Sequence, residues 1–138
     1  MPWEHFSHQA DMGIRGRGNS KEEAFELAAL ALMAVITNPE DVEPAVCVTL
    51  SCEDADIELL FAEWINVLVY EMATRKMLFS RFSVTLKDEH SLIGEAWGEP
   101  VDVAKHQPAV EVKGATYTAL EVRQEADGSW VAQCVVDV

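Results

Sequence analysis

Two aspartates, Asp11 and Asp137, stand where a carboxylate has no simple solvent role. Asp11 lies in the short polar stretch 8–13 that leads into a strand-like segment, and Asp137 interrupts the apolar tail 134–138. A carboxylate buried there without a partner would be costly, so we expect a divalent cation, a lysine, backbone amides or water to satisfy it. Carboxylate and water ligands suit Ca, Mg or Mn, which makes the two aspartates candidate metal ligands.

Few other residues could contribute chemistry. His8, three residues before Asp11, is a candidate metal ligand or acid/base group, although a lone histidine near a carboxylate is more often simply hydrogen-bonded. Lys105, His106 and Lys113 are candidate partners for acidic groups or phosphate, with a solvated surface role as the commoner alternative. The sequence contains no nucleophile elbow, zinc-protease motif, EF-hand or P-loop. It therefore shows no recognisable catalytic constellation.

The net charge of the chain limits the classes of molecule that it can bind. The 138 residues include 10 Lys and Arg against 24 Asp and Glu, a formal net charge of −14, and 49% are hydrophobic. Such a surface repels phosphate, so we expect no direct binding to nucleic acid or to an anionic membrane. Cys47, Cys52 and Cys134 match no disulfide framework or zinc motif, and we expect them to be buried in a reducing compartment. With neither a signal peptide nor a membrane span, the sequence predicts a cytoplasmic protein.

Two helices must position these residues. Ser20 followed by Glu23 forms a capping box, and the apolar spacing after it predicts a helix over about 20–36, ended by Pro39. A second helix over about 56–73 follows an acidic stretch. Its apolar stripe has the spacing of a partner groove or a cofactor box, but we expect it to face the core.

The remaining segments read as strands. Residues 45–52 and 82–86 alternate apolar and polar side chains, 91–97 and 116–123 are further candidates, and an Asp-Gly turn at 126–129 leads into 130–138. In the last of these, Asp137 shares a face with Val131, Gln133 and Val135. We predict an α+β fold: a single compact domain over 1–138 with a mixed or antiparallel β-sheet covered by the two helices.

In this order, the segments resemble the archease family over nearly the whole chain. The resemblance rests on the combined order and spacing of several short motifs, of which the penultimate aspartate is the most telling. These are His8-Gln9-Ala10-Asp11-Met12-Gly13-Ile14-Arg15 with Gly18, Glu22-Glu23-Ala24-Phe25, Val42-Glu43-Pro44, Leu59-Leu60, Trp64-Ile65-Asn66, Leu68-Val69-Tyr70, Gly98-Glu99, Lys105-His106, residues 111–117 and Val136-Asp137-Val138. Gln9 stands where threonine is common, and Gly114 where alanine is often seen.

The resemblance implies an accessory protein of the GTP-dependent RNA ligase of the RtcB type, which joins tRNA halves or broken RNA. Archeases assist guanylylation of the ligase and its multiple turnover without ligating RNA themselves. By motif position, the family's metal-binding carboxylates fall on Asp11 and Asp137, and Lys105, His106 and Lys113 lie near the expected interaction surface. An acidic protein in an RNA pathway is also expected to act on the enzyme and not on the RNA.

Two other functions remain open at this stage. One is a free-standing metal-dependent hydrolase that uses the same aspartates with His8 as general base; it would need an enclosed pocket and a positioned nucleophile. The other is a chaperone-like modulator of a tRNA-modifying enzyme, which archeases are also described as being. A general chaperone without a metal is expected to have an exposed apolar surface, whereas a metal-binding protein is expected to have a carboxylate pocket.

Overall fold

Both long helices begin at the capping residues that the sequence identifies. In the computed structural model, which describes residues 2–138, helix α1 spans Lys21–Ile36, and Ser20 Oγ accepts a hydrogen bond from Glu23 N at 3.1 Å. Helix α2 spans Ile57–Arg75, and Asp56 caps it by accepting from the backbone N–H of Leu59. The predicted helices are confirmed, with α2 extending two residues further than expected.

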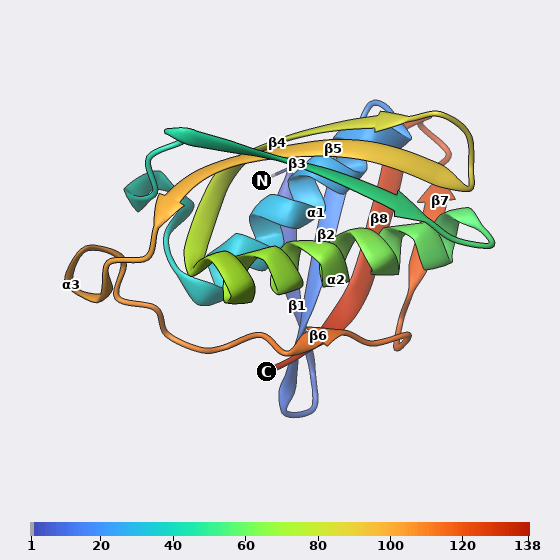
Figure 1. The fold of residues 1–138 in the computed structure, drawn as a ribbon. Coiled ribbons are helices and arrows are strands. Elements are labelled where there is room, and N and C mark those ends of the chain that lie inside the picture. Colours follow the sequence, from blue (N-terminus) through green and yellow to red (C-terminus); the bar gives the residue numbers. More distant parts are fainter. Residues whose placement is uncertain (1) are drawn as a thin grey trace.

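The strands form two antiparallel sheets (Figure 1). In the first sheet β8 is central: it pairs with β2 on one side and with β6 and β7 on the other, and β1 pairs with β2. The second sheet has the order β3-β5-β4. The bounds are β1 Trp3–His8, β2 Asp11–Gly18, β3 Val46–Glu53, β4 Met77–Leu86, β5 Ser91–Pro100, β6 Gly114–Ala115, β7 Glu121–Gln124 and β8 Trp130–Asp137, with short helices η1 Pro39–Asp41 and α3 Val103–His106. The α+β prediction is confirmed, and the sheet it expected is divided in two.

Two strand predictions differ from the structure. Most of 116–123 is not a strand, because the chain turns there: Ala119 has a positive φ of 54°, and only β7 resumes the pairing with β8. Strand β4 begins at Met77, before the predicted start at Phe82. Its first three residues are all buried, so they lack the alternation by which the sequence would reveal a strand.

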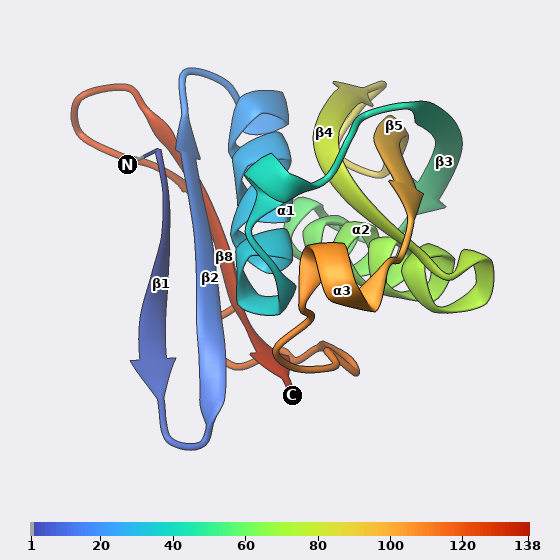
Figure 2. The same ribbon diagram turned by 90° about the vertical axis from the view of Figure 1, so that its left-hand side faces the viewer.

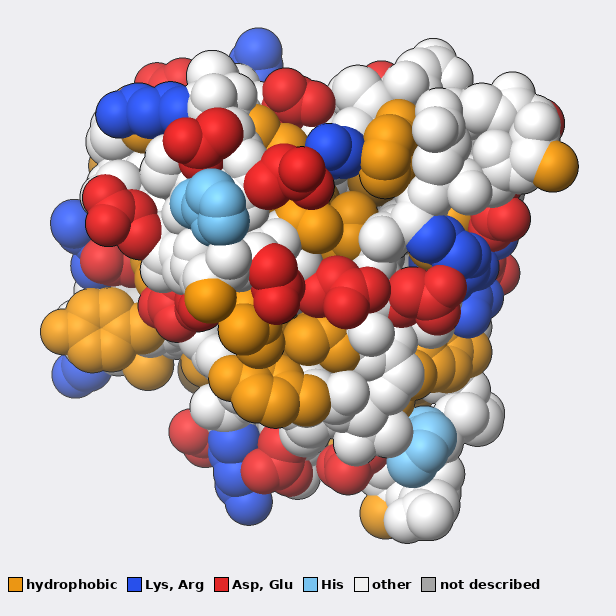
Figure 3. Space-filling view, turned by 90° about the vertical axis from the view of Figure 1, so that its right-hand side faces the viewer, with side chains coloured by type: hydrophobic (Ala, Val, Ile, Leu, Met, Phe, Trp, Pro, Cys, Tyr) orange, Lys and Arg blue, Asp and Glu red, His pale blue; other side chains and the backbone are white. Residues whose placement is uncertain are grey.

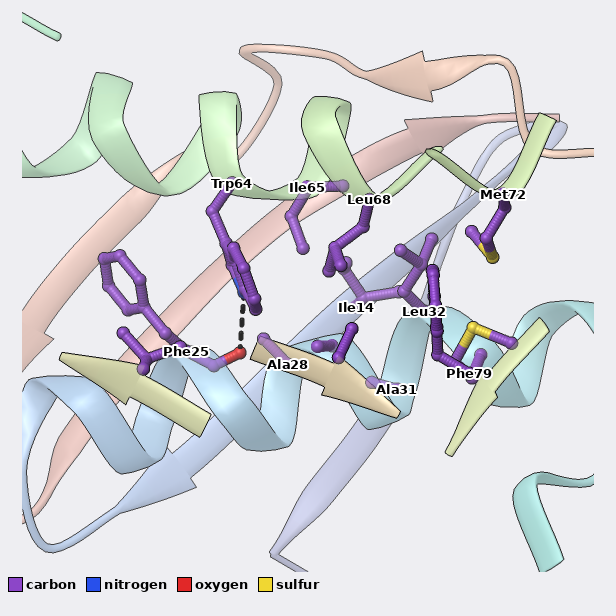
Figure 4. Close-up of a cluster of buried hydrophobic side chains, with 14 of the residues drawn as sticks. Ile14, Phe25, Ala28, Ala31, Leu32, Trp64, Ile65, Leu68, Met72 and Phe79 are labelled. Carbon is purple, nitrogen blue, oxygen red and sulfur yellow. Dashed lines mark hydrogen bonds between the residues drawn. The ribbon is translucent and has the colours of Figure 1, made fainter. Parts of the chain in front are cut away.

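Helix α1 lies between the two sheets, and α2 packs beside it (Figure 2). This position explains why α1 is buried over much of its circumference and is rich in alanine, since small side chains let a helix approach a sheet on both sides. The centre of the core is formed by large side chains from both helices and both sheets (Figure 4). Trp64 is fully buried, and its indole N–H donates to the carbonyl of Phe25 at 3.2 Å, which ties α2 to α1.

The three cysteines differ in their burial. Cys52 and Cys134 are buried, and burial raises the pKa of each thiol to about 12. The expectation that all three are buried is wrong for Cys47, which is exposed. Side chains alternate along β3, so Cys47 lies on the solvent face while Val48, Leu50 and Cys52 face the core.

Candidate functional site

The first candidate residues meet at the tip of the hairpin formed by β1 and β2. His8 and Asp11 are paired across the two strands, and Gln9 and Ala10 form the turn between them. Gln9 has a φ of 53°, a left-handed conformation that is costly for a residue with a Cβ atom. The turn therefore places His8 and Asp11 opposite each other at one end of the sheet.

Strand β8 brings Asp137 to the same end. Met12 pairs with Val136 in the antiparallel register, so the next residues outward, Asp11 and Asp137, are opposite each other although 126 positions apart in sequence. The backbone N–H of Val138 donates to Asp11 Oδ1 at 3.5 Å, which confirms that the strand ends are adjacent. Figures 1 and 2 both show the hairpin turn and the end of β8 at the same side of the molecule.

Both carboxylates lie on the sheet face turned away from the helices. Three pairs inward in the same ladder, Ile14 and Cys134 are fully buried in the core, whereas Arg15 in the next pair donates to Gln133 at 2.8 Å on the opposite face. Because side chains alternate, Asp11 and Asp137 share the face of Arg15 and Gln133. Asp137 is exposed and Asp11 half-buried. The sequence prediction of the face of Asp137 is confirmed, and its carboxylate is not buried.

We refer to Asp11, Asp137, His8 and Lys113 as the aspartate corner. Lys113 joins it through the backbone, since its N–H donates to the Asp137 carbonyl at 2.7 Å. Its side chain is exposed and forms no ion pair within residues 2–138. Six of the other cations, including Lys105, are ion-paired. Lys113 is therefore free to reach a ligand or a partner at this corner.

Close packing against α2 explains why a glycine follows Lys113. Gly114 pairs with Asp137, and the next N–H, that of Ala115, donates to Asn66 Oδ1 on α2 at 2.8 Å. A Cβ atom at Gly114 would lie 2.9 Å from that same oxygen, closer than ordinary van der Waals contact. Glycine thus leaves room for the Asn66 amide to hold β6 in place beside Asp137.

Lys105 and His106 form a separate cluster on α3. Glu99 Oε2 accepts hydrogen bonds from Lys105 Nζ at 2.8 Å, from the backbone N–H of Glu43 at 2.9 Å and from His106 Nε2 at 2.9 Å. His106 Nδ1 accepts from the N–H of Asp102, so the proton of the neutral ring is on Nε2. These bonds, with that of Lys105 the strongest, lower the pKa of Glu99 to about 2.

This cluster has a structural role. The His106 side chain is fully buried, and Figure 1 shows α3 at one edge of the molecule, away from the β1–β2 turn and the end of β8. Of the candidates, the structure thus groups His8, Asp11, Asp137 and Lys113, and it places Lys105 and His106 elsewhere. Sequence reasoning missed Glu99, the residue that binds them both. Gly98-Glu99 is among the motifs that carry the resemblance, but the one sign of this pairing is the position of Glu99 six and seven residues before Lys105 and His106.

The donor set at the aspartate corner fits a hard cation that keeps water or takes ligands from another molecule. No three His, Cys, Asp or Glu side chains between residues 2 and 138 come together as a complete metal cage. Two facing carboxylates with open positions are what Mg²⁺ commonly uses, and Ca²⁺ and Mn²⁺ accept the same oxygen ligands. A structural zinc site is built from four Cys or His ligands, and this corner offers only the imidazole of His8.

An apolar cavity lies elsewhere in the molecule. It has a volume of about 340 Å³ between the end of α2 and residues 101–112, and neither aspartate lines it. The aspartate corner is instead an open strand end, of a kind that can contact another macromolecule directly. No helix in the part of the chain described here combines the length and apolar character needed to cross a membrane.

Comparisons with known proteins point to one family. The family model described as "Archease protein family (MTH1598/TM1083)" matches residues 3–138. The chain is 40% identical to the protein archease of Pyrococcus furiosus and 38% identical to that of Methanopyrus kandleri, over 98% or more of each protein. The solution structure of Methanobacterium thermoautotrophicum protein 1598 matches with a TM-score of 0.80 and 34% identity, covering 99% of both chains. A Thermotoga maritima structure titled "archease, possible chaperone" shares the fold, with a TM-score of 0.63 and 16% identity, over 98% of this chain and 96% of that one.

Proposed function

Because this chain belongs to the archease family, we propose that it is an accessory protein of a GTP-dependent RNA ligase of the RtcB type. In this role it promotes guanylylation of the ligase and multiple turnover, and does not itself join RNA. The observation that carries the proposal is the juxtaposition of Asp11 and Asp137, with the unpaired Lys113 beside them, at an exposed corner.

The charge of the protein supports action on the enzyme. At −14, its surface repels RNA, and much of its positive charge is neutralised by ion pairs. A protein of this kind reaches an RNA pathway through a protein partner. The open strand end at Asp137 can approach the nucleotide site of a ligase without an RNA contact.

We assign the roles at this corner as follows. Asp11 and Asp137 hold a divalent ion, Mg²⁺, Mn²⁺ or Ca²⁺, which when bound supplies positive charge close to phosphate oxygens. The rigid antiparallel register fixes the spacing of the two carboxylates, and Val138 N–H orients the Asp11 carboxylate. Lys113 offers a movable ammonium to an anionic group of the partner or its nucleotide. His8 lies on the other side of Asp11 and can hydrogen-bond to it or to water.

The test is RNA joining by the cognate ligase with GTP and manganese, at limiting ligase, with and without equimolar accessory protein. We expect turnovers per ligase to rise from about one to many, and the Asp11→Asn, Asp137→Asn and Lys113→Met variants to lose most of the rise. Lys105→Met is the matched control, since Lys105 is paired with Glu99 and should leave stimulation intact. No rise with the wild-type protein would refute the accessory role, and full stimulation by both aspartate variants would refute the part assigned to Asp11 and Asp137.

The two alternatives predict other outcomes. A hydrolase would show metal-dependent activity with no ligase present, and His8 is placed to serve it as a base opposite Asp11. The open corner offers no enclosed cavity for a substrate, which favours the accessory role. A chaperone-like modulator would instead keep a tRNA-modifying enzyme from aggregating, in a manner independent of Asp11 and Asp137.

A further inference from the structure

The edge strands of the two sheets differ in whether their free backbone groups are hydrogen-bonded. On β4, the N–H of Val84 donates to Glu26 of α1 at 2.8 Å. On β7, the N–H of Val122 donates to Glu58 of α2 at 3.1 Å, and on β6 Asn66 accepts from Ala115 in the same manner. Each of these strands pairs with one neighbour only, so each bond occupies an otherwise free edge. A helix side chain therefore occupies a backbone donor on each of these three edges.

Strand β3 has no such protection. It pairs with β5 along Val46–Glu53, and within residues 2–138 its backbone forms hydrogen bonds to no other element. In an antiparallel edge strand, every second residue directs both its N–H and its C=O away from the neighbour, so a row of donors and acceptors is left for another strand. Figures 1 and 2 both show the outer side of β3 free of other elements.

The sequence of β3 also lacks the devices that normally discourage pairing. Its register with β5 is continuous, whereas β4 has a bulge between Phe79 and Arg81. Residues 46–52 contain no charge, proline or glycine and are rich in β-branched side chains. The remaining edge strand, β1, is shorter and carries Glu4 and two histidines. The edge of β3 is thus the one in the described chain that is best suited to accept a strand.

Charge around β3 indicates what kind of strand fits. Glu53 ends β3, Asp54 and Asp56 follow it, and Glu95 lies on the neighbouring strand. On the side facing α2, burial and then the negative charge of Glu63 raise the pKa of the Cys52 thiol. No ion pair neutralises any of these acids within the described residues.

Figure 3 views the molecule from the side on which β3 ends and α2 begins, and acidic side chains form a row across the middle of that face. A second copy of the chain would bring the same acids and another −14 charge, so repulsion disfavours self-pairing. A segment with lysine or arginine at its ends and uncharged residues between them complements both the neutral strand and the acids around it.

We propose that the free edge of β3 binds an extended, Lys/Arg-flanked segment of a partner protein by strand addition, with the partner's backbone continuing the β3-β5-β4 sheet. Main-chain hydrogen bonds supply the affinity, and the surrounding carboxylates select a basic segment. This surface is distinct from the aspartate corner. If strand addition at β3 were disproved, the RNA-ligase proposal would be unaffected. Disproof of the RNA-ligase role would likewise leave strand addition unaffected.

The probe is a synthetic nine-residue peptide of alternating valine and threonine with two lysines at each end, titrated into the full chain and followed by amide hydrogen exchange in NMR. In the free protein, alternate amides of β3 should exchange fast, and the peptide should slow those amides selectively. The control peptide has the same sequence, but the amides that would face β3 are N-methylated, which removes the hydrogen-bond donors to β3 without changing charge. We expect it to bind at least tenfold more weakly.

Protein variants test the charge requirement. Glu53→Gln and Glu63→Gln should each weaken peptide binding about two- to threefold at low salt, while Asp127→Asn, in the distant β7–β8 turn, should not. Equal binding of the methylated peptide, or no slowing of β3 exchange, would overturn strand addition. Slow exchange of alternate β3 amides that depends on protein concentration without peptide would show that a second copy occupies the edge, and would overturn the basic-partner assignment.

Discussion

Replacing Asp11 or Asp137 by asparagine changes the charge of the aspartate corner and little else, because an asparagine Oδ1 can still accept the N–H of Val138. Directly opposed positions on neighbouring antiparallel strands hold their side chains about 5 Å apart. At that separation, two unit charges in a water-like dielectric repel each other by about 0.8 kcal/mol. Without a cation, each single variant should therefore be more stable than the wild type by up to this amount.

Metal reverses the order of stability. An ion held by both carboxylates at 100 times its Kd adds about 2.7 kcal/mol to the free energy of unfolding. The wild type should therefore gain about 10 °C in Tm on addition of manganese or calcium, while each variant gains little. In EDTA, the variants should melt about 3 °C above the wild type.

Thermal melting of the wild type and both variants, in EDTA and in excess metal, measures all of these differences at once. Asp127→Asn is the control, since it removes one carboxylate far from the corner and should respond to metal as the wild type does. The reasoning is refuted if both variants melt below the wild type in EDTA and still gain as much as the wild type from metal. That result would mean that the carboxylates stabilise the fold and do not hold the ion.

Three further predictions concern the framework. Gln9→Gly should raise the free energy of unfolding by about 1 kcal/mol, because glycine adopts the left-handed turn without a steric cost; an unchanged urea midpoint would contradict this. Gly16→Ala should lower the free energy of unfolding by about 3 kcal/mol or more, because the added Cβ would lie 2.2 Å from the Ala28 backbone nitrogen. A loss below about 1 kcal/mol in urea unfolding would show that α1 can shift. Glu99 has a pKa of about 2 against an ordinary 4.5, so its carboxylate stabilises the fold above pH 4.5 and loses this contribution as the pH falls to 2. The urea midpoint of Glu99→Gln should therefore approach that of the wild type as the pH falls over this range. A constant difference between the two midpoints would contradict this prediction.

Local signals in the sequence predicted the helices well, since a cap is decided by residues within one turn: Ser20 and Glu23 mark the start of α1 in sequence and in structure. The β1–β2 hairpin was less visible. Its turn is Gln9-Ala10, which lacks the Asn-Gly or Asp-Gly pair that usually announces a two-residue turn. The pairing of β1 with β2, and of β2 with β8, compensates for the unfavourable conformation of Gln9.

The candidate site was predictable in part. Asp137 stood out as a charge in an apolar tail, but its position opposite Asp11 depends on the insertion of β8 beside β2, which no local pattern encodes. The family resemblance places Lys105 and His106 near the same interaction surface as the aspartates. Their partner Glu99 is brought to them by the turn between β5 and α3, and that turn decides that they support the fold.

The central place of β8 has a consequence for synthesis in the cell. Strands β1 and β2 leave the ribosome well before residues 130–137, yet only these later residues fill the free edge of β2. Such a long-range pairing is a late folding event. A chain interrupted before β8 would carry Asp11 without Asp137, so the carboxylate pair can form only in molecules that have completed the sheet.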